Sequence, residues 1–315
     1  MNIDNKFMQE SILKIEHLSH RYNIQWAVRD ISFEIPKRGI YGLLGSNGAG
    51  KSTTMNIISG VIKQTEGSIF IKGVDARKSS IDAKRHIGFL PQKPPLYGDL
   101  TVEEFLRYSA RLRWVSNQEL KSSVEEVLSR CGITHFRKRL IKNLSGGYQQ
   151  RVGIAQAIIH KPDIVIFDEP TNGLDPNQIM EVRHLIKDIA QERTVILSTH
   201  ILPEVQATCD HIMMIEQGKL VFMGTVDEFD NYIVPNTLYL SMMDPPAMEE
   251  LNNLENVLGV EELGERKFRV RFNDAQGAID DIVKQCAIHD WHLSEIRVEK
   301  SSLDKVFSEL SKKVQ

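Results

Sequence analysis

The sequence is poor in cysteine, has no long apolar run and carries no excess of positive charge. Its three cysteines, Cys131, Cys209 and Cys286, lie far apart, without the close spacing of a metal site or a redox pair. No stretch approaches the roughly 18 consecutive apolar residues of a membrane span, and the first residues lack the apolar core of a signal peptide. Lysine and arginine total 39 against 42 acidic residues, a net charge of −3, which offers nucleic acid no basic field. These features favour a cytoplasmic protein with reduced thiols and no nucleic-acid partner.

A glycine-rich run between a strand-like and a helix-like segment is the most informative feature that is present. It fits G-x-x-x-x-G-K-[ST] and consists of Gly45, Ser46, Asn47, Gly48, Ala49, Gly50, Lys51, Ser52 and Thr53. In such a loop the backbone N–H groups surround phosphates, Lys51 supplies charge to the β and γ oxygens, and Ser52 offers a hydroxyl to Mg²⁺. A helix expected from about Lys51 to Val61 adds its positive end. The run therefore predicts a nucleoside-triphosphate site, and an incidental glycine-rich turn is the alternative.

A second anion-binding pattern lies at residues 144–151, Leu-Ser-Gly-Gly-Tyr-Gln-Gln-Arg. Ser145, Gly146 and Gly147 are expected at the N-terminus of an amphipathic helix that runs to about His160. One nucleotide does not need two such helix ends, unless the second serves a nucleotide held by another copy. Here the chain resembles the ATP-binding subunits of ABC transporters, whose LSGGQ signature has this form. Tyr148 replaces the signature glutamine, and an ordinary N-capped helix is the alternative for the run alone.

Five further elements fall in the order that this family requires, so the resemblance spans about residues 12–225. Two of them are strands that end in polar residues. The apolar run 164–167, which follows Asp163, ends in Asp168 and Glu169, and this places two acids where α/β sheets hold ligands. By the resemblance, Asp168 orients Mg²⁺ and Glu169 is the base that polarises the attacking water. His200 ends the next such strand and is similar to the switch histidine of the family, which contacts the γ-phosphate. Taken singly, adjacent acids fit a turn and a lone histidine is more often structural.

The same resemblance assigns three more positions. Gln92 follows a short strand and matches the glutamine that reaches Mg²⁺ and the catalytic water. Asp175 lies in a run similar to the D-loop, where two subunits meet. Tyr22 matches the aromatic residue that stacks on adenine, although Trp26 is close enough to compete and Tyr22 also fits a half-buried position on a sheet.

A length of 315 residues with 41% hydrophobic content predicts more than one domain. We expect residues 12–230 to form an α/β P-loop NTPase of the ABC ATPase fold. Short alternating runs in residues 12–80 predict an antiparallel β subdomain, and the periodicity of residues 101–150 predicts a helical subdomain. Residues 236–315 predict a smaller α+β, ferredoxin-like domain of order βαββαβ. Its strands are expected at 237–240, 256–262, 267–272 and 293–299, and its helices at 246–254, 274–288 and 301–310.

This C-terminal segment also resembles the accessory domain of ATPases from ABC-2 type exporters. Those chains often end with a serine-leucine-acid-x-valine-phenylalanine run, which residues 302–307 match. Other amphipathic C-terminal helices look similar. Because the segment has no phosphate loop, paired acids or metal spacing, we expect it to act in assembly or regulation.

Taken together, the resemblance implies an ATP-hydrolysing exporter subunit that uses ATP and Mg²⁺. Two copies would enclose two ATP molecules and drive a separate transmembrane permease, which would hold the chain at the inner face of the cell membrane. Residues 92–114 are the expected dock for the permease because they include Leu96, Tyr97, Phe105, Tyr108 and Trp114, although core positions are the alternative for each.

Two other functions are alternatives to the exporter. A soluble ABC ATPase that acts on DNA or the ribosome usually has a long coiled-coil insertion or two cassettes, whereas this chain has one P-loop and no sustained heptads. A plain P-loop kinase leaves the run at 144–151 unexplained. The transported substrate is not encoded in any of these motifs.

Overall fold

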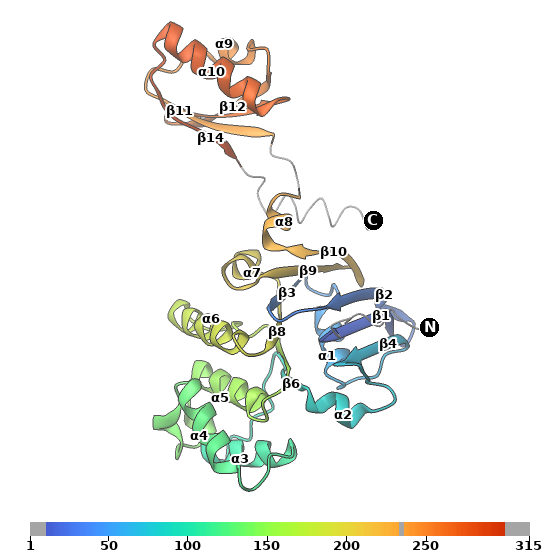
Figure 1. Cartoon of the computed structure of the whole chain (residues 1–315). Helices are drawn as coiled ribbons and strands as arrows, with labels where there is room; N and C mark the ends of the chain where they lie inside the picture. Colours follow the sequence, from blue (N-terminus) through green and yellow to red (C-terminus); the bar gives the residue numbers. More distant parts are fainter. Residues whose placement is uncertain (1–10, 233–235, 300–315) are drawn as a thin grey trace, which may run out of the picture. The chain divides into compact units, whose positions relative to one another are not determined.

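The computed structural model describes residues 11–232 and 236–299 (Figure 1). Their contacts group them into two compact units, one up to Val226 and the other from Asp227 onward. The predicted helix 301–310 and the matching run 302–307 lie outside the described residues.

The first unit is built on a six-stranded sheet in the order β10-β9-β3-β8-β7-β6. Five of its strands are parallel, and only the β9–β10 pair is antiparallel. Every residue of β3, β7 and β8 is buried, as expected for parallel strands covered on both faces. The strands are β3 (Ile40–Leu44), β6 (Ile87–Leu90), β7 (Ile164–Asp168), β8 (Thr194–Thr199), β9 (His211–Glu216) and β10 (Lys219–Thr225).

A second sheet of this unit is antiparallel, as the sequence predicts, with the order β2-β1-β4-β5. Its strands are β1 (Leu13–Tyr22), β2 (Gln25–Ile35), β4 (Glu66–Ile71) and β5 (Val74–Asp75). β1 extends beyond the short run visible in the sequence because its pairing with β2 continues through several register shifts. One apolar core joins this sheet to the six-stranded one and includes Leu13, Ile69, Ile166 and Ile196.

Helix α1 (Lys51–Ile58) follows β3 and begins within the glycine-rich run. The predicted end at Val61 was wrong. The helix stops at Ile58 because Ser59 caps it and Gly60 turns the chain into the left-handed region at φ 71°. The next helix, α2 (Ser80–Arg85), leads into β6.

Three helices form the helical subdomain and gather beside the edge strand β6 (green in Figure 1). They are α3 (Val102–Leu112), α4 (Leu120–Arg130) and α5 (Gly146–Ile158). Thr101 and Glu104 form a capping box that begins α3. α5 approaches β6 so closely that a Cβ on Gly88 would lie 2.0 Å from the carbonyl oxygen of Ala157. Phe105 is only 3% exposed and belongs to the core, so its predicted place on a docking surface was wrong.

The remaining helices of the first part of the chain are α6 (Pro176–Ala190), α7 (Leu202–Thr208) and α8 (Val226–Asp230). α6 follows β7 after a short loop, and α7 follows β8 directly. Among the residues that the structure describes, no helix combines the length and the apolar character needed to cross a membrane.

The second unit has a four-stranded antiparallel sheet in the order β12-β13-β11-β14. Its elements are β11 (Thr237–Met242), α9 (Met248–Asn252), β12 (Val257–Gly264), β13 (Lys267–Phe272), α10 (Ala275–His289) and β14 (Leu293–Glu299). This order is that of the predicted split βαβ, ferredoxin-like arrangement. Its own core includes Leu240, Val270 and Ile282 and shares no described residue with the core of the first unit.

A chain truncated after Asn231 is expected to keep the fold of the first unit, because that unit buries a separate core. The measurements are far-UV circular dichroism and thermal unfolding with and without ATP, with the full-length chain as the control. We expect both proteins to unfold in a cooperative transition, and we expect ATP to raise the midpoint temperature of that transition in both. Loss of that transition in the truncated chain would contradict the separation of the cores.

Candidate nucleotide-binding site

The glycine-rich run connects β3 to α1 and depends on glycine for its backbone. Gly48 and Gly50 have φ values of 83° and 110°, a region that other residues rarely adopt. A Cβ on Gly50 would also lie 2.5 Å from the carbonyl oxygen of Ala27. Gly50 is the N-cap of α1, so the first N–H groups of that helix lie next to the loop. The loop therefore has the conformation and the donors of an anion-binding site.

Lys51 is buried at the start of α1, with its ammonium group held by the loop itself. Its Nζ donates to the carbonyl oxygens of Gly45 at 2.8 Å and Ser46 at 3.0 Å. Burial lowers the pKa of Lys51, and the carboxylates of Glu169, Asp168 and Glu216 oppose that shift. Glu216 also accepts from the Ser46 hydroxyl at 2.8 Å, so the end of β9 supports the loop.

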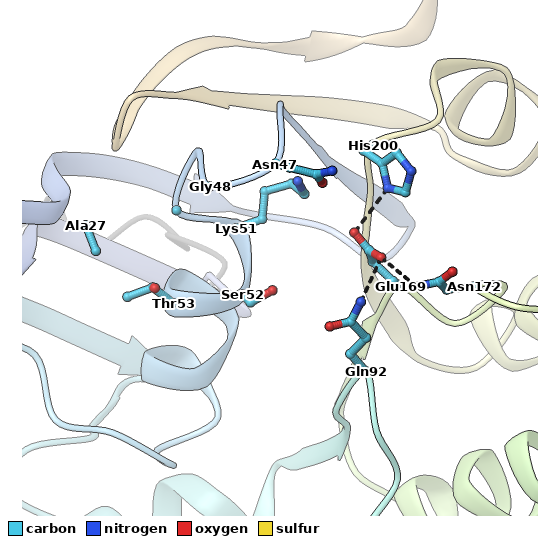
Figure 2. A pocket seen from close by; sticks show the side chains of 11 residues that line it. Ala27, Asn47, Gly48, Lys51, Ser52, Thr53, Gln92, Glu169, Asn172 and His200 are labelled. Carbon is cyan, nitrogen blue, oxygen red and sulfur yellow. Dashed lines mark hydrogen bonds and ion pairs between the residues drawn. The ribbon is translucent and has the colours of Figure 1, made fainter. Parts of the chain in front are cut away.

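A cavity of about 420 Å³ opens beside this loop and brings distant parts of the chain together (Figure 2). Gln92, Glu169 and His200 face the loop from the ends of three different strands. The lining residues are Ala27, Asn47, Gly48, Gly50, Lys51, Ser52, Thr53, Gln92, Glu169, Asn172 and His200.

The carboxylate of Glu169 is the centre of the polar contacts in this cavity (Figure 2). Its Oε1 lies 3.2 Å from His200 Nδ1, and its Oε2 accepts from Gln92 at 3.1 Å and from Asn172 at 3.2 Å. The backbone of Glu169 is left-handed at φ 48°, and its N–H donates to the Ser198 hydroxyl at 3.0 Å. Such a conformation is costly for a residue with a side chain and persists only where neighbours hold it. The carboxylate is thus fixed in direction by contacts from three segments.

Asp168 and Ser52 form an oxygen-rich corner next to Glu169. The Ser52 hydroxyl donates to Asp168 Oδ1 at 3.2 Å, and the Ser198 hydroxyl donates to the same oxygen. A hydroxyl, a carboxylate and the nearby Gln92 amide are hard oxygen donors, a set that fits Mg²⁺ when phosphate and water complete the shell. Within the described ranges, no group of three or more His, Cys, Asp or Glu side chains is arranged to bind a metal unaided.

Ser145, Gly146 and Gly147 begin α5, away from this cavity. Ser145 is the exposed N-cap in an extended conformation, and its side chain does not cap the described helix. Gly147 and Asp175 line a separate hollow of about 240 Å³, and the described lining of the Lys51 cavity includes none of these four residues. The structure therefore does not join the second anion-binding pattern to the P-loop of the same chain.

The N-terminal ends of α5 and α6 are tied to each other. A Cβ on Gly147 would lie 2.5 Å from the side-chain amide of Gln178, so glycine allows that amide to pack against the helix. Asp175 caps α6 by accepting from the Gln178 N–H at 3.0 Å. One turn further along, Arg151 of α5 pairs with Glu181 of α6.

Tyr148, which replaces the signature glutamine, belongs to an aromatic cluster. Its ring meets Phe136 edge-on at 4.5 Å, and the Arg151 guanidinium lies over it at 5.7 Å. The replacement therefore adds packing to the helical subdomain.

Tyr22 lies at the end of β1 and is 51% exposed, with its ring edge-on to His20 at 4.7 Å. It is not among the described residues that line the cavity. Trp26 is partly buried and has the Arg21 guanidinium over its ring at 5.5 Å.

Asn172, Ser198 and Glu216 were missed by the sequence analysis. Asn172 lies three residues after Glu169, and an amide so close to a strand end was a usable signal. Ser198 lies within a strand whose polar end was noted, but its bonds to Asp168 and Glu169 depend on strand pairing. Nothing local marks Glu216 because its contact with Ser46 spans 170 positions.

Comparisons with known proteins agree with this geometry. The family model described as "ABC transporter" matches residues 28–172, and one described as "AAA domain, putative AbiEii toxin, Type IV TA system" matches residues 143–205. The Linearmycin resistance ATP-binding protein LnrL of Bacillus subtilis (strain 168) is 31% identical over 306 residues, 95% of this chain and 98% of that protein. The Bacitracin transport ATP-binding protein BcrA of Bacillus licheniformis is 40% identical over 213 residues, 67% of this chain and 69% of that protein.

A solved structure is also similar. The dimeric post-hydrolysis state of the ATP-binding cassette MJ0796 bound to ADP and Pi has a TM-score of 0.62 at 25% identity, covering 68% of this chain and 98% of that one. Because LnrL is matched over nearly its whole length, the chain belongs to the ATP-binding proteins of the ABC transporter family, which bind and hydrolyse ATP.

Proposed function

We propose that this chain is the ATPase subunit of an ABC exporter, in which two copies enclose two ATP molecules and drive a separate permease. The main support is that the N-termini of α1 and α5 both have the form of an anion-binding site but do not line the same cavity. The P-loop would bind the phosphates of its own ATP, and α5 would complete the site of the other copy. The names of LnrL and BcrA refer to resistance and transport, and the MJ0796 cassette is described as a dimer.

Within one site, Lys51 and the N–H groups of the loop would bind the β- and γ-phosphates. Glu169 would accept the proton of the attacking water as general base. The amides of Gln92 and Asn172 and the ring of His200 support this role because they hold the carboxylate from two sides. Tyr22 would stack on adenine, which its half-exposed ring permits.

Ser52, Asp168 and Gln92 would hold Mg²⁺, as their hydroxyl, carboxylate and amide oxygens suit this ion. When bound, the ion would neutralise the charge that develops on the phosphates.

Ser145, Gly146 and Gly147 would bind the γ-phosphate held by the partner copy. The exposed N-cap and the first N–H groups of α5 support this role. Asp175 would lie at the contact between the copies, at the N-terminus of α6.

The permease would dock on the surface around residues 92–114. Tyr97, Tyr108 and Trp114 are exposed, and the two tyrosine rings meet edge-on at 5.7 Å. Trp114 also lines a groove of about 550 Å³ with Ile81 and Leu112, more apolar surface than a solvated lobe needs. Docking there would hold the chain at the inner face of the cell membrane.

The boundaries of the two domains are also a proposal, with residues 12–230 as the nucleotide-binding domain and 236–315 as an accessory domain for assembly or regulation. The division of contacts near Asp227 supports a boundary in this region. A soluble ABC ATPase that acts on DNA or the ribosome gains no support. The longest helices in the described part of the chain, α6 and α10, have 15 residues each, too few for a long coiled-coil arm.

Glu169→Gln is expected to keep ATP binding and to lower turnover roughly 10²–10⁴-fold, because an amide keeps the shape and loses the base. Steady-state ATP hydrolysis and nucleotide titration measure the two effects, and a dimer with trapped ATP should accumulate on gel filtration. Lys51→Ala is the matched control because it should weaken binding, whereas His200→Ala should chiefly slow hydrolysis. Hydrolysis by Glu169→Gln at the parent rate would show that Glu169 is not the base.

Ser145→Arg is expected to abolish hydrolysis while its own subunit still binds ATP, because Ser145 acts on the partner's nucleotide. Mixing this variant with Lys51→Ala should restore part of the activity, since a mixed dimer has one site with both lesions and one with neither. Each variant alone should stay inactive at the same total concentration. Loss of ATP binding by Ser145→Arg itself would contradict action across the dimer.

Single cysteines at Tyr97, Tyr108 or Trp114 are expected to form crosslinks with a cytoplasmic loop of the co-purified permease. The native thiols should not interfere, because all three are buried and burial raises the pKa of Cys131 to about 12. Ile24→Cys is the matched control, since Ile24 is 93% exposed in the turn between β1 and β2. Crosslinks from Ile24→Cys and none from the three aromatic positions would place the dock elsewhere.

A further inference from the structure

Glu204 is a buried acid on α7 that belongs to none of the motifs described above. Its side chain is enclosed, and the whole residue is only 7% exposed. The Thr171 hydroxyl donates to its Oε1 at 2.9 Å and its Oε2 at 3.0 Å. The Thr199 hydroxyl donates to its Oε2 at 2.9 Å. One carboxylate thus binds two threonines that lie 28 positions apart.

The two threonines flank the residues proposed to carry out hydrolysis. Thr171 lies two positions after Glu169 and one before Asn172, whose amide binds the Glu169 carboxylate. Thr199 immediately precedes His200, and its hydroxyl also accepts from the Ile201 N–H at 3.0 Å. The peptide segment that carries His200 is therefore bound on both sides. A shift of Glu204 would therefore move the segment that follows Glu169 and the segment that precedes His200 together.

The surroundings of Glu204 are those of a fixed anchor. A carboxylate taken out of water is costly unless it is paired and hydrogen-bonded. Arg183 of α6 supplies the positive charge, with Nη2 at 3.7 Å from Glu204 Oε1. Thr171 and Thr199 are themselves buried, so water competes little for their hydroxyls. These buried hydrogen bonds are directional, so they fix the distance between the two segments that they join.

We propose that Glu204 is a positioning residue for ATP hydrolysis, which sets the distance between the chain after Glu169 and the chain before His200. Glu204 is not among the described residues that line the Lys51 cavity, and it acts through its two threonines. The inference rests on the proposed roles of Glu169 and His200.

Thr199→Val tests the proposal with the least disturbance, because valine keeps the shape and removes only the hydroxyl. We expect the turnover number of the full-length chain to fall about tenfold, as small misplacements of catalytic groups cost one to two powers of ten. The Kd for ATP should stay unchanged, because the P-loop is not involved. Thr194→Val is the matched control. Thr194 is buried on the same strand, and its hydroxyl has no hydrogen-bond partner among the described residues.

A double-mutant cycle separates positioning from general stability. In a His200→Ala background, Thr199→Val should slow the residual hydrolysis far less than in the parent, because its effect passes through the histidine. Equal slowing in both backgrounds, or the same slowing by Thr194→Val, would overturn the proposal.

Glu204→Gln gives a second route. Glutamine loses the negative charge that faces Arg183 and keeps only one acceptor oxygen for the two threonines, so their bonds weaken. We expect a similar loss of turnover at unchanged ATP affinity. If Glu204→Gln does not fold, the double-mutant cycle of Thr199→Val and His200→Ala still tests the proposal. Glu169→Gln is measured in parallel. If Glu169→Gln hydrolyses ATP slowly but Thr199→Val hydrolyses it at the parent rate, only the proposed role of Glu204 is refuted. If Glu169→Gln itself hydrolyses ATP at the parent rate, the proposed hydrolytic centre is refuted.

Discussion

The parallel pairing of β3, β8 and β7 is the constraint on which the site depends. Leu44 pairs with Thr199 and Asp168 with Ser198, so the three strands end at one edge of the sheet. Since all three strands are buried along their whole length, polar groups that need solvent or a ligand are confined to that edge. The phosphate loop, the acids and the histidine meet there because each lies at the C-terminal end of one of these three strands.

Much of this arrangement was predictable because its signals are local. The P-loop, the acid pair at 168–169 and the histidine at 200 each follow an apolar run, and the alternation of residues 267–272 correctly predicted a strand, which is β13. The sequence could not predict the tertiary contacts. Glu204 looks like any glutamate in the first turn of a short helix, and only the packing of α7 buries it. Phe105 fits either a docking surface or the core in the sequence, and only the packing of α3 assigns it to the core.

The second unit shows how one alternating pattern serves two purposes. The inward side chains of β11 and β13 form its core, while the outward ones form a charged ladder in which Arg269 bonds Glu299 and Glu261. Arg269 lowers the pKa of Glu299 through these bonds. Arg297 lies over the ring of Tyr239 at 4.7 Å on the same ladder. A sheet with one apolar and one charged face can remain folded in water without a partner on its open side.

The packing of Gln178 on Gly147 has a mechanical consequence. Together with the pair formed by Arg151 and Glu181, it joins the first two turns of α5 to the first two turns of α6. Ser145 and Asp175 are the N-caps of these two helices, so the same contacts connect the two N-caps. In a twofold assembly, a displacement of one N-cap would therefore move the other. Nucleotide binding at one site would then displace groups that face the other site.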